Sequence, residues 1–367
     1  MSTDITRYKL SKKQIQAFRS SLLDWYDVKK RDLPWRAKSG QTPDPYRVWL
    51  SEVMLQQTTV GTVIPYFKKF VDKWPCVQDL ARADLNQVMD EWAGLGYYSR
   101  ARNLHKAANI VAVELAGIFP DDQKALKALP GVGDYISAAV RSIAFDLPAT
   151  VVDGNVERVI ARHNCVEKPM PDSKKLLKQI AHFISVDQTD RPGDFAQAMM
   201  DLGATICTPK SPSCGQCPLR STCKALKAGL AEKLPNKIKK AANPQKRGHV
   251  YWIENEKGEV LLERRGESGM LARMVGFPTS NWLATEKARP EHDLAFIASK
   301  SVKPQPLPVS IVHSFTHFDI MLGGHKLIIN SNEFQPIENK ELFWQDIESL
   351  QKTKFPTLFK KFYNFMV

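Results

Sequence analysis

The chain has 367 residues, of which 43% are hydrophobic and 25% charged, and its formal net charge is +13. This composition excludes a disordered or fibrous protein and predicts two or three globular domains. The N-terminal sequence MSTDITRYKLSKKQ lacks the apolar core of a signal peptide, and no uninterrupted apolar run is long enough to cross a bilayer. We therefore expect a cytoplasmic protein with a polyanionic partner, since strong positive charge favours nucleic acid or an anionic surface.

The first half of the chain carries helical patterns. Residues 11–30 have apolar residues at helical spacing, and the sequence RDLPWR (31–36) ends that helix. On the next helix, from about Tyr46, one face carries Val48, Glu52, Leu55 and Thr59. Glu52 thus lies in a largely apolar stripe, where lost hydration raises the pKa of a carboxyl group and lets it donate a proton near neutral pH. The alternative is a buried Glu paired with a basic residue.

A glycine-containing break, LPGVG (129–133), separates two further helical segments. A helix that stops and restarts at once makes a tight hairpin, and its bare backbone N–H groups suit a phosphate. The alternative is an ordinary connector. Upstream, GLGYY (94–98) followed by Arg100 and Arg102 suits stacking on bases beside phosphate contacts, or equally a packing corner. Other helical segments are expected at 66–70, 83–92, 101–115, 121–129, 136–143, 174–184 and 194–206.

Four cysteines fall within seventeen positions, as Cys207-x6-Cys214-x2-Cys217-x5-Cys223. Such clustering in a reducing compartment predicts a metal site rather than disulfides. Four thiolates satisfy either a structural zinc or an iron–sulfur cluster, and the spacing does not choose between them.

The pattern changes after a polar, basic stretch at 229–247, which contains two prolines and which we expect to be a linker. Beyond it, 250–253 and 260–262 flank a turn and predict a β-hairpin. Strands are expected near 309–312 and 318–330, and helices near 291–299 and 356–366. The C-terminal domain is therefore expected to mix α and β structure.

Together these stretches resemble the MutY-type adenine DNA glycosylases of the endonuclease III, or helix-hairpin-helix, superfamily. The resemblance covers most of residues 15–225, and the last 120 residues match more loosely. It implies a mostly α N-terminal helix-hairpin-helix glycosylase part with a four-cysteine cluster loop, plus a smaller α+β Nudix-like C-terminal domain. The motifs that carry it are LPWR (33–36), PYRVWLSEVMLQQT (45–58), GLGYYSRARNLHKAA (94–108), LPGVG (129–133), VDGNVERV (152–159), QAMMDLGATIC (197–207) and the cysteine spacing. The implied domains are a catalytic region 1–228, with a helical barrel at 37–148 and a second helical domain from 1–36 and 149–228, the linker 229–247 and a mismatch-recognition domain 248–367.

The resemblance implies catalytic roles for Glu52, Asp153, Tyr135 and Asn155. Glu52 would protonate a flipped adenine at N7, and Asp153 would stabilise the oxocarbenium-like sugar or capture it covalently. Asp153 also suits the N-cap of the helix from Asn155, and the two roles are compatible. Tyr135 stands where bifunctional relatives carry the lysine that forms a Schiff base, so base removal without efficient strand cleavage is expected.

The resemblance also implies DNA contacts, because a base inside a duplex must be extruded before it can react. Gly131 and Gly133 would present hairpin amides to the DNA backbone. Gln57 and Tyr97 would fill or wedge the base stack, Tyr97 beside the damaged base opposite. The C-terminal loop Phe315, Thr316 and His317 replaces a Phe-Ser-His loop that reads 8-oxoguanine; threonine keeps the hydroxyl and adds a methyl. That domain lacks a Nudix catalytic box, which argues against nucleotide pyrophosphatase activity. The adenine pocket would be lined by Arg31, Trp35, Arg36, Leu55 and Asp201, with Thr58 among the other DNA contacts. The alternative for the Asp201 carboxylate is that it caps a helix or pairs with a nearby group.

The implied cofactor is one structural [4Fe-4S] cluster on Cys207, Cys214, Cys217 and Cys223, supporting a basic loop around Lys210 and Arg220. The implied partner is double-stranded DNA with 8-oxoG:A or G:A mispairs, bound by a monomer that is nucleoid-associated if the protein is bacterial. Two alternatives stay open: a thymine-removing or endonuclease III-like glycosylase, and a non-catalytic DNA-binding protein with a metal. Glu52 argues against both, since pyrimidine removal offers no N7 to protonate and a pure binder has no use for a desolvated acid.

Overall fold

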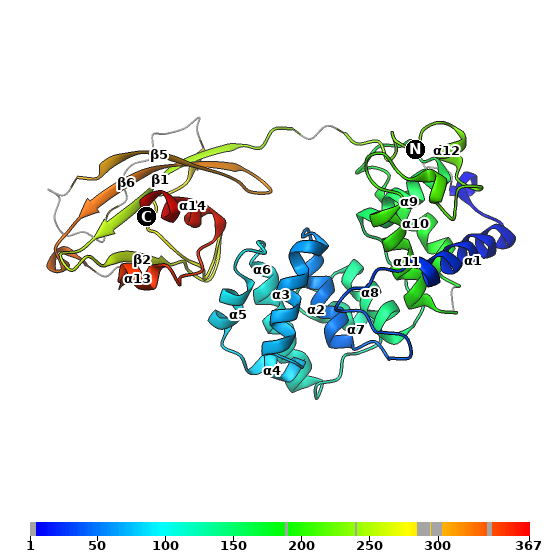
Figure 1. The fold of residues 1–367 in the computed structure, drawn as a ribbon, viewed down its shortest axis with the longest axis horizontal. Helices are drawn as coiled ribbons and strands as arrows, with labels where there is room; N and C mark the ends of the chain where they lie inside the picture. Colours follow the sequence, from blue (N-terminus) through cyan, green and yellow to red (C-terminus); the bar gives the residue numbers. More distant parts are fainter. Residues whose placement is uncertain (1–4, 188–189, 239–240, 285–293, 295–302, 336–339) are drawn as a thin grey trace. The chain divides into compact units, whose positions relative to one another are not determined.

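The computed structural model describes residues 5–187, 190–238, 241–284, 294, 303–335 and 340–367. The chain divides into two compact units, one of residues 1–83 and 103–239 and the other of residues 84–102 and 240–367. We call them unit 1 and unit 2. Unit 1 is helical, and unit 2 contains a β-sheet with helices (Figure 1). This confirms the predicted fold class, a mostly α part followed by a smaller α+β part.

Most helices predicted for the first part are present. Unit 2 takes in α5 (Leu85–Trp92), and α6 (Ser99–Asn109) spans both units. No helix among the described residues is both long and apolar enough to cross a membrane. Unit 1 contains α1 (Lys12–Lys29), α2 (Pro45–Leu55), α3 (Val60–Lys73), α4 (Val77–Arg82), α7 (Gln123–Ala128), α8 (Asp134–Phe145), α9 (Gly154–Asn164), α10 (Lys174–Ser185), α11 (Pro192–Thr205) and α12 (Lys224–Lys227), with short turns η1 (Ile5–Tyr8), η2 (Ile110–Glu114) and η3 (Cys214–Gln216).

Helix α8 forms the centre of unit 1. It packs against α2 on one side and α11 on another, and α11 also contacts α1 and α9. Eight of its twelve residues are buried, from Ile136 to Ala144, because small alanines and serines allow helices to approach it on several sides. These contacts place α2, α8, α11 and the start of α9 around one point, which is where the candidate site lies.

One helix prediction is wrong at its end. The expected stripe on the helix from Tyr46 included Thr59, but α2 ends at Leu55. Gln57 follows with a left-handed φ of 57°, which an α-helix cannot contain. Thr59 instead caps α3, where its side chain accepts a hydrogen bond from Thr62 N–H.

The Gly-Val-Gly break forms the predicted tight turn between α7 and α8. Gly131 has a φ of +77°, and a Cβ there would come within 2.8 Å of the Asn103 Cβ, so the backbone conformation and the close packing both require glycine. Val132 is buried and anchors the turn. Gly133 precedes α8 at its N-cap, and a Cβ there would meet open space. The backbone at Gly133 is therefore accessible to a ligand.

Unit 2 is built on a mixed sheet, seven-stranded in the part of the chain that the structure describes, with strand order β3-β2-β1-β6-β5. Strands β1 and β6 run parallel, whereas β1 and β2 form the predicted antiparallel hairpin. Strand β7 extends the sheet beside β2, and β4 pairs with β1. The strands are β1 (Gln245–Glu254), β2 (Val260–Arg264), β3 (Val275–Gly276), β4 (Leu283–Ala284), β5 (Gln305–Ser314), β6 (Asp319–Ile328) and β7 (Glu341–Gln345), followed by α13 (Ile347–Leu350) and α14 (Thr357–Met366), with a short turn η4 (Ser331–Glu333) before β7.

The two faces of the sheet bury different side chains, as strand alternation requires. On one face, Trp252 stacks on Phe277, and Phe277 also contacts Phe359 and Phe362 of α14. On the other face the buried residues are Tyr251, Ile253, Leu261, Leu327 and Ile329. The helix expected at 356–366 is α14, whereas the helix expected at 291–299 lies, except for Leu294, outside the described residues.

The stretch expected as a linker, 229–247, begins as part of unit 1. Leu234 is buried there, and its carbonyl accepts a hydrogen bond from Arg162 Nε at 2.8 Å. Lys237 forms an isolated parallel bridge with Met170. Strand β1 of unit 2 starts at Gln245.

Candidate active site

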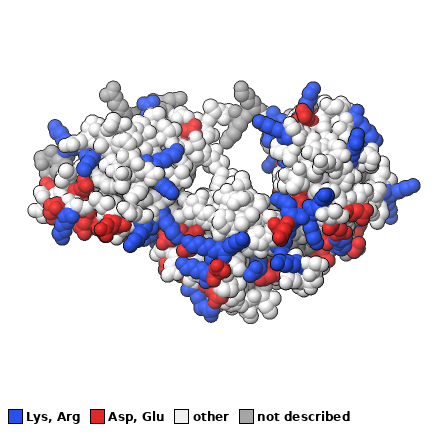
Figure 2. Space-filling view, in the orientation of Figure 1, with Lys and Arg blue, Asp and Glu red and all other residues white. Residues whose placement is uncertain are grey.

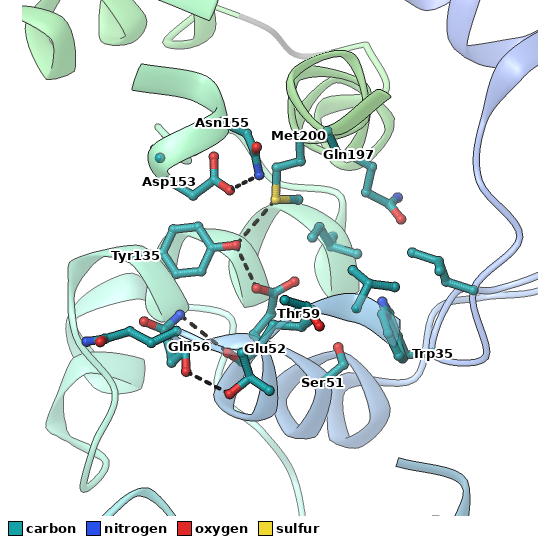
Figure 3. Close-up of a pocket in the computed structure, with 18 of the residues that line it drawn as sticks. Trp35, Ser51, Glu52, Gln56, Thr59, Tyr135, Asp153, Asn155, Gln197 and Met200 are labelled. Atoms are coloured by element: carbon teal, nitrogen blue, oxygen red, sulfur yellow. Dashed lines mark hydrogen bonds between the residues drawn. The ribbon is translucent and has the colours of Figure 1, made fainter. Parts of the chain in front are cut away.

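A cavity of about 630 Å³ opens in unit 1 between α2, α8, α11 and the start of α9. Glu52, Tyr135, Asp153 and Met200 line it, each from a different one of these segments (Figure 3). The structure thus brings together residues that are up to 148 positions apart in the sequence. A partly enclosed cavity of this size with converging polar groups is typical of a small-molecule or base-sized site.

Glu52 is a buried acidic residue in the lining of this cavity. The residue is only 4% exposed, and its Oε2 accepts a hydrogen bond from the Tyr135 hydroxyl at 2.7 Å. Burial raises the pKa of Glu52 from 4.5 to about 7, and the nearby Asp153 charge also raises it, whereas the Tyr135 hydrogen bond and Arg36 lower it. The predicted upward shift is therefore confirmed. The alternative of a buried Glu in an ion pair is not what the described residues show, since Arg36 pairs with Asp201.

The raised pKa of Glu52 makes stability depend on pH. Between its unfolded value of 4.5 and its folded value of about 7, the folded protein holds a proton that the unfolded chain has lost. The associated stability is fully present below pH 4.5 and is lost as the pH rises to about 7, up to about 3 kcal/mol. We therefore expect Glu52→Gln to lose less stability than the wild type between pH 5 and pH 8 in urea denaturation. Equal losses in both proteins would contradict this.

Asp153 is held at the start of α9 by two hydrogen bonds. Its Oδ1 accepts from Val156 N–H at 2.8 Å, which confirms the predicted N-cap, and its Oδ2 accepts from Asn155 Nδ2 at 2.7 Å. Asn155 is fixed in turn, because its Oδ1 accepts from Arg158 Nη2 at 2.8 Å. The helix dipole at this end also favours a negative charge. The Asp153 carboxylate is therefore oriented by its own helix and by the amide two residues later.

Helix α11 approaches α9 closely at Gly203. A Cβ on Gly203 would lie 2.5 Å from the Asn155 Cβ, a distance that requires backbone movement. We expect Gly203→Ala to destabilise the protein by about 1–3 kcal/mol, as overpacking does, and to displace Asn155. Urea denaturation measures this. The matched control is Gly61→Ala in α3, where a Cβ meets nothing within 4 Å and alanine should stabilise the helix slightly; equal effects of the two substitutions would refute the packing argument.

A buried ion-pair cluster forms the wall of the cavity on the side of Trp35. Asp201 is fully buried, and its carboxylate accepts hydrogen bonds from Arg36 Nη1 and Nη2 at 2.7 and 2.8 Å and from Arg31 Nε at 2.6 Å. Arg31 N–H also donates to it at 3.1 Å. These bonds and charges, led by the Arg36 hydrogen bond, outweigh burial and lower the pKa of Asp201. The structure places Arg31 and Arg36 in the cavity lining and Asp201 behind them, where it fixes both guanidinium groups.

The other residues predicted for the site separate into two groups. Trp35, Leu55, Gln57 and Thr58 line the cavity of unit 1 together with the two arginines. Gln57 is exposed and takes its left-handed conformation at the cavity rim, a strained backbone typical of functional segments.

Tyr97, Phe315, Thr316 and His317 lie together in unit 2. They line a cavity of about 410 Å³. The Tyr97 hydroxyl is 3.0 Å from Thr316 Oγ1, and Tyr97 is 42% exposed. Residues 84–102 are thus tied to the loop at 315–317, although Tyr97 and Thr316 are 219 positions apart.

The four clustered cysteines all lie around the segment 207–223 and are free thiols in intermediate burial. Burial raises the pKa of Cys217 to about 11, and the other three cysteines contribute to the same shift. Among the described residues, no group of three or more His, Cys, Asp or Glu side chains is arranged to hold a metal ion. Arg162 Nη1 lies 3.3 Å from Cys207 Sγ, and the Arg162 side chain also donates to the carbonyls of Thr208 and Pro209. The buried Arg162 guanidinium would stabilise the negative charge of sulfur ligands at this place.

The charge of the chain is distributed over both units. Lys and Arg side chains occur widely on the face drawn in Figure 2, among fewer Asp and Glu. This agrees with the polyanionic partner expected from the net charge.

Comparison with known families identifies the parts of the chain. The profile of HhH-GPD superfamily base excision DNA repair proteins matches residues 50–185. That of the iron-sulfur binding domain of endonuclease III matches residues 207–223, and that of the NUDIX domain matches residues 249–364. A solved thermostable thymine-DNA glycosylase has a TM-score of 0.52 at 30% identity, covering 59% of this chain and 98% of that one.

Several curated relatives share one name. The adenine DNA glycosylase of Mus musculus is 48% identical over 86% of this chain and 71% of its own length. That of Homo sapiens is 37% identical over 84% of this chain and 66% of its own, and that of Buchnera aphidicola subsp. Baizongia pistaciae is 33% identical over 93% and 94%. Against the mammalian and plant relatives, the chain spans between 42% and 71% of their length.

The helical fold, its hairpin and its acidic cavity, together with the first profile, define a base excision DNA repair protein of the HhH-GPD superfamily. Residues 207–223 are an iron–sulfur binding segment of the endonuclease III type, and the C-terminal part is a Nudix-like domain. The extent and identity of the curated matches settle the family: the chain belongs to the adenine DNA glycosylases.

Some residues of the site escaped sequence reasoning. Met200 touches Tyr135 across 65 positions, and nothing in its surroundings in the sequence marks that contact. Gln197 lines the same cavity one helical turn before it. The contact between Arg158 and Asn155 could have been predicted from the sequence, because residues three apart on a helix are neighbours.

Proposed function

We propose that this chain removes adenine from double-stranded DNA by hydrolysing the N-glycosidic bond. The observation that carries the proposal is Glu52, a carboxyl group buried in a cavity with its pKa raised to about 7. Such a group is part-protonated at neutral pH and matches the need for a general acid. A purine offers N7 as the proton acceptor, whereas a pyrimidine has no such atom.

The chain's own residues would divide the reaction as follows. Glu52 donates a proton to adenine N7, and the N-glycosidic bond breaks with its electron pair going to the base. The Asp153 carboxylate stabilises the resulting positive charge on the sugar, and water completes the hydrolysis. Asn155 keeps Asp153 oriented, while Trp35 and Leu55 flank the extruded base.

We propose that the enzyme is monofunctional. Tyr135, on the first turn of α8, has no amine and cannot form a Schiff base. Lys174 is the lysine among the described lining residues, and it lies 3.9 Å from Glu157 with its side chain 61% exposed. We expect no covalent product on borohydride reduction during turnover and strand cleavage only after alkali. A trapped adduct, lost in Lys174→Ala, would assign lyase activity to that lysine.

The proposed substrate is a duplex with adenine opposite 8-oxoguanine or guanine. Support comes from unit 2, where Tyr97 and the loop 315–317 line one cavity and the Tyr97 hydroxyl lies 3.0 Å from the Thr316 hydroxyl. Gly131 and Gly133 would bind the backbone through the hairpin amides, as the open space at Gly133 allows. We further propose a monomer acting in the cytoplasm, with the domain division at 229–247.

We propose one [4Fe-4S] cluster on Cys207, Cys214, Cys217 and Cys223. Support comes from the iron-sulfur binding domain match at residues 207–223 and from the Arg162 guanidinium 3.3 Å from Cys207 Sγ. When bound, the cluster would supply no chemistry to the base removal but would cross-link the loop that carries Lys210 and Arg220. Iron and acid-labile sulfide in equal amounts, about four of each, would support it; a colourless protein with one zinc would replace it.

The experiment that tests the proposed function is single-turnover base release from duplexes carrying 8-oxoG:A, G:A, T:A and G:T. Adenine release from the first two, with no release from G:T, is the expected result. Thymine release from G:T would favour the second candidate, a thymine glycosylase, for which the fold likeness to the solved thymine-DNA glycosylase is the specific observation. Tight duplex binding without release of any base would favour a non-catalytic binder.

A further inference from the structure

The Tyr135 hydroxyl lies between two acceptors. It is 2.7 Å from Glu52 Oε2 and 3.3 Å from the Met200 Sδ (Figure 3). A phenol has a single hydrogen to donate, and a thioether sulfur has none. Tyr135 can therefore make both hydrogen bonds at once only when Glu52 donates to its oxygen and its own hydrogen points at Met200.

The two protonation states of Glu52 then have different hydrogen-bond directions. When Glu52 is ionised, Tyr135 donates to Oε2 and makes only van der Waals contact with the sulfur. When Glu52 is protonated on Oε2, the carboxyl group donates to the Tyr135 oxygen and the phenol hydrogen turns to Met200 Sδ. Either direction leaves Glu52 Oε1 without a hydrogen bond from the described residues, so that it remains available at the cavity.

We propose that Met200 is a positioning residue for base removal: its sulfur accepts a hydrogen bond from the Tyr135 hydroxyl while Glu52 is protonated. The hydroxyl therefore has a hydrogen-bond acceptor in both protonation states of Glu52. The inference rests on the proposed function and adds to it a group that acts through Tyr135. Sulfur is a weak acceptor, which suits this role, because the Tyr135 hydroxyl must donate its hydrogen bond to Glu52 again once the proton of Glu52 has left.

The charges around Glu52 show why such an acceptor matters. Arg36 favours the ionised carboxylate, although Asp201 neutralises it, and Asp153 favours the protonated form. The remaining charged groups of the cavity lining are Arg31, which also pairs with Asp201, and the pair Glu157 and Lys174. Without Met200 the phenol hydrogen would have only Glu52 as its acceptor among the described residues, and Tyr135 would oppose protonation of the acid.

Proton balance is simple in this scheme. A half-turn of the carboxyl group about χ3 brings the protonated oxygen to the base, and the proton passes to adenine N7 while the bond electrons leave with the base. The Tyr135 hydroxyl then rotates, so that its hydrogen bond is donated to the carboxylate oxygen that now faces Tyr135 instead of to Met200 Sδ. Tyr135 keeps its own proton throughout, and Met200 neither gains nor loses one.

The test measures the Glu52 carboxyl directly, by NMR titration of protein labelled with ¹³C in its glutamate side chains. The Glu52 signal is assigned as the one that Glu52→Gln removes. Met200→Leu keeps the size and apolarity of the side chain but removes the acceptor, and we expect the midpoint of the Glu52 titration to fall by about half a pH unit. Met199→Leu is the matched control, since Met199 is buried next to it on α11 but does not line this cavity; its midpoint should stay at the wild-type value.

A second pair of proteins separates hydrogen bonding from packing. In a Tyr135→Phe background no phenol hydrogen exists, so adding Met200→Leu should leave the midpoint where Tyr135→Phe alone puts it. An equal fall in both backgrounds, or no fall in Met200→Leu itself, would overturn the proposal. The titration needs no DNA, so it gives its answer even if adenine is not the base released. If adenine is released, the pH profile of the single-turnover rate should shift by the same amount.

Discussion

Glu52→Gln is expected to lower the single-turnover rate of adenine release by about 10²–10⁴-fold, the contribution typical of a positioned general acid. Glutamine has nearly the same shape and can still accept a hydrogen bond from Tyr135, so the cavity should stay intact. What it cannot do is give a proton to N7. The measurement is the rate of base release from an 8-oxoG:A duplex with enzyme in excess.

The pH profile of the wild type supplies a second readout of the same group. In the proposed mechanism protonated Glu52 is the active form, and its pKa of about 7 predicts a rate that falls as the pH rises through that value. The residual rate of Glu52→Gln should lack this limb. The matched control is Glu114→Gln on the exposed turn η2, which should behave as the wild type. A Glu52→Gln enzyme within threefold of the wild type would remove Glu52 from the mechanism.

Local chemistry explains why the environments of the two proposed catalytic carboxylates were predictable from sequence. Glu52 lies in an apolar stripe of one helix, so its burial follows from helical periodicity alone. Asp153 precedes a helical segment, and its N-cap bond follows from the same local reasoning. The hairpin was equally readable, because Gly131 needs a conformation that other residues rarely adopt.

Long-range packing explains what sequence reasoning did not give. The Tyr135–Met200 contact depends on how α8 meets α11, and no spacing within either helix encodes it. Asp201 shows the same limit: its carboxylate was expected at the pocket wall or in a nearby pair, but its partners are two arginines of a loop 165 and 170 residues away, which no local pattern identifies. The association of residues 84–102 with unit 2 likewise depends on tertiary contacts such as Arg102 Nη1 to the Ala272 carbonyl at 3.1 Å.

The Asp201 cluster leads to the second large effect, on stability. Asp201 is fully buried, and it is the partner of Arg36, whose side chain is only 11% exposed. Removing the carboxylate by Asp201→Ala leaves a buried guanidinium without its counter-charge and releases the Arg31 backbone N–H as well. Breaking a buried pair in this way costs about 3–5 kcal/mol, since desolvation of the remaining charge is no longer offset.

Urea denaturation of Asp201→Ala should therefore show a much lower midpoint than the wild type. The matched control is Asp27→Ala, which breaks the exposed pair with Arg191 and should cost at most about 1 kcal/mol. A third variant, Asp201→Asn, keeps acceptor capacity but removes the charge and should fall between them. Equal losses of unfolding free energy in Asp201→Ala and Asp27→Ala would mean that solvent reaches the Arg36 guanidinium. The cavity wall would then be less rigid than its geometry indicates. A large cost confined to Asp201 would instead establish this cluster as the rigid side of the site, against which an extruded base can be held while Glu52 delivers its proton.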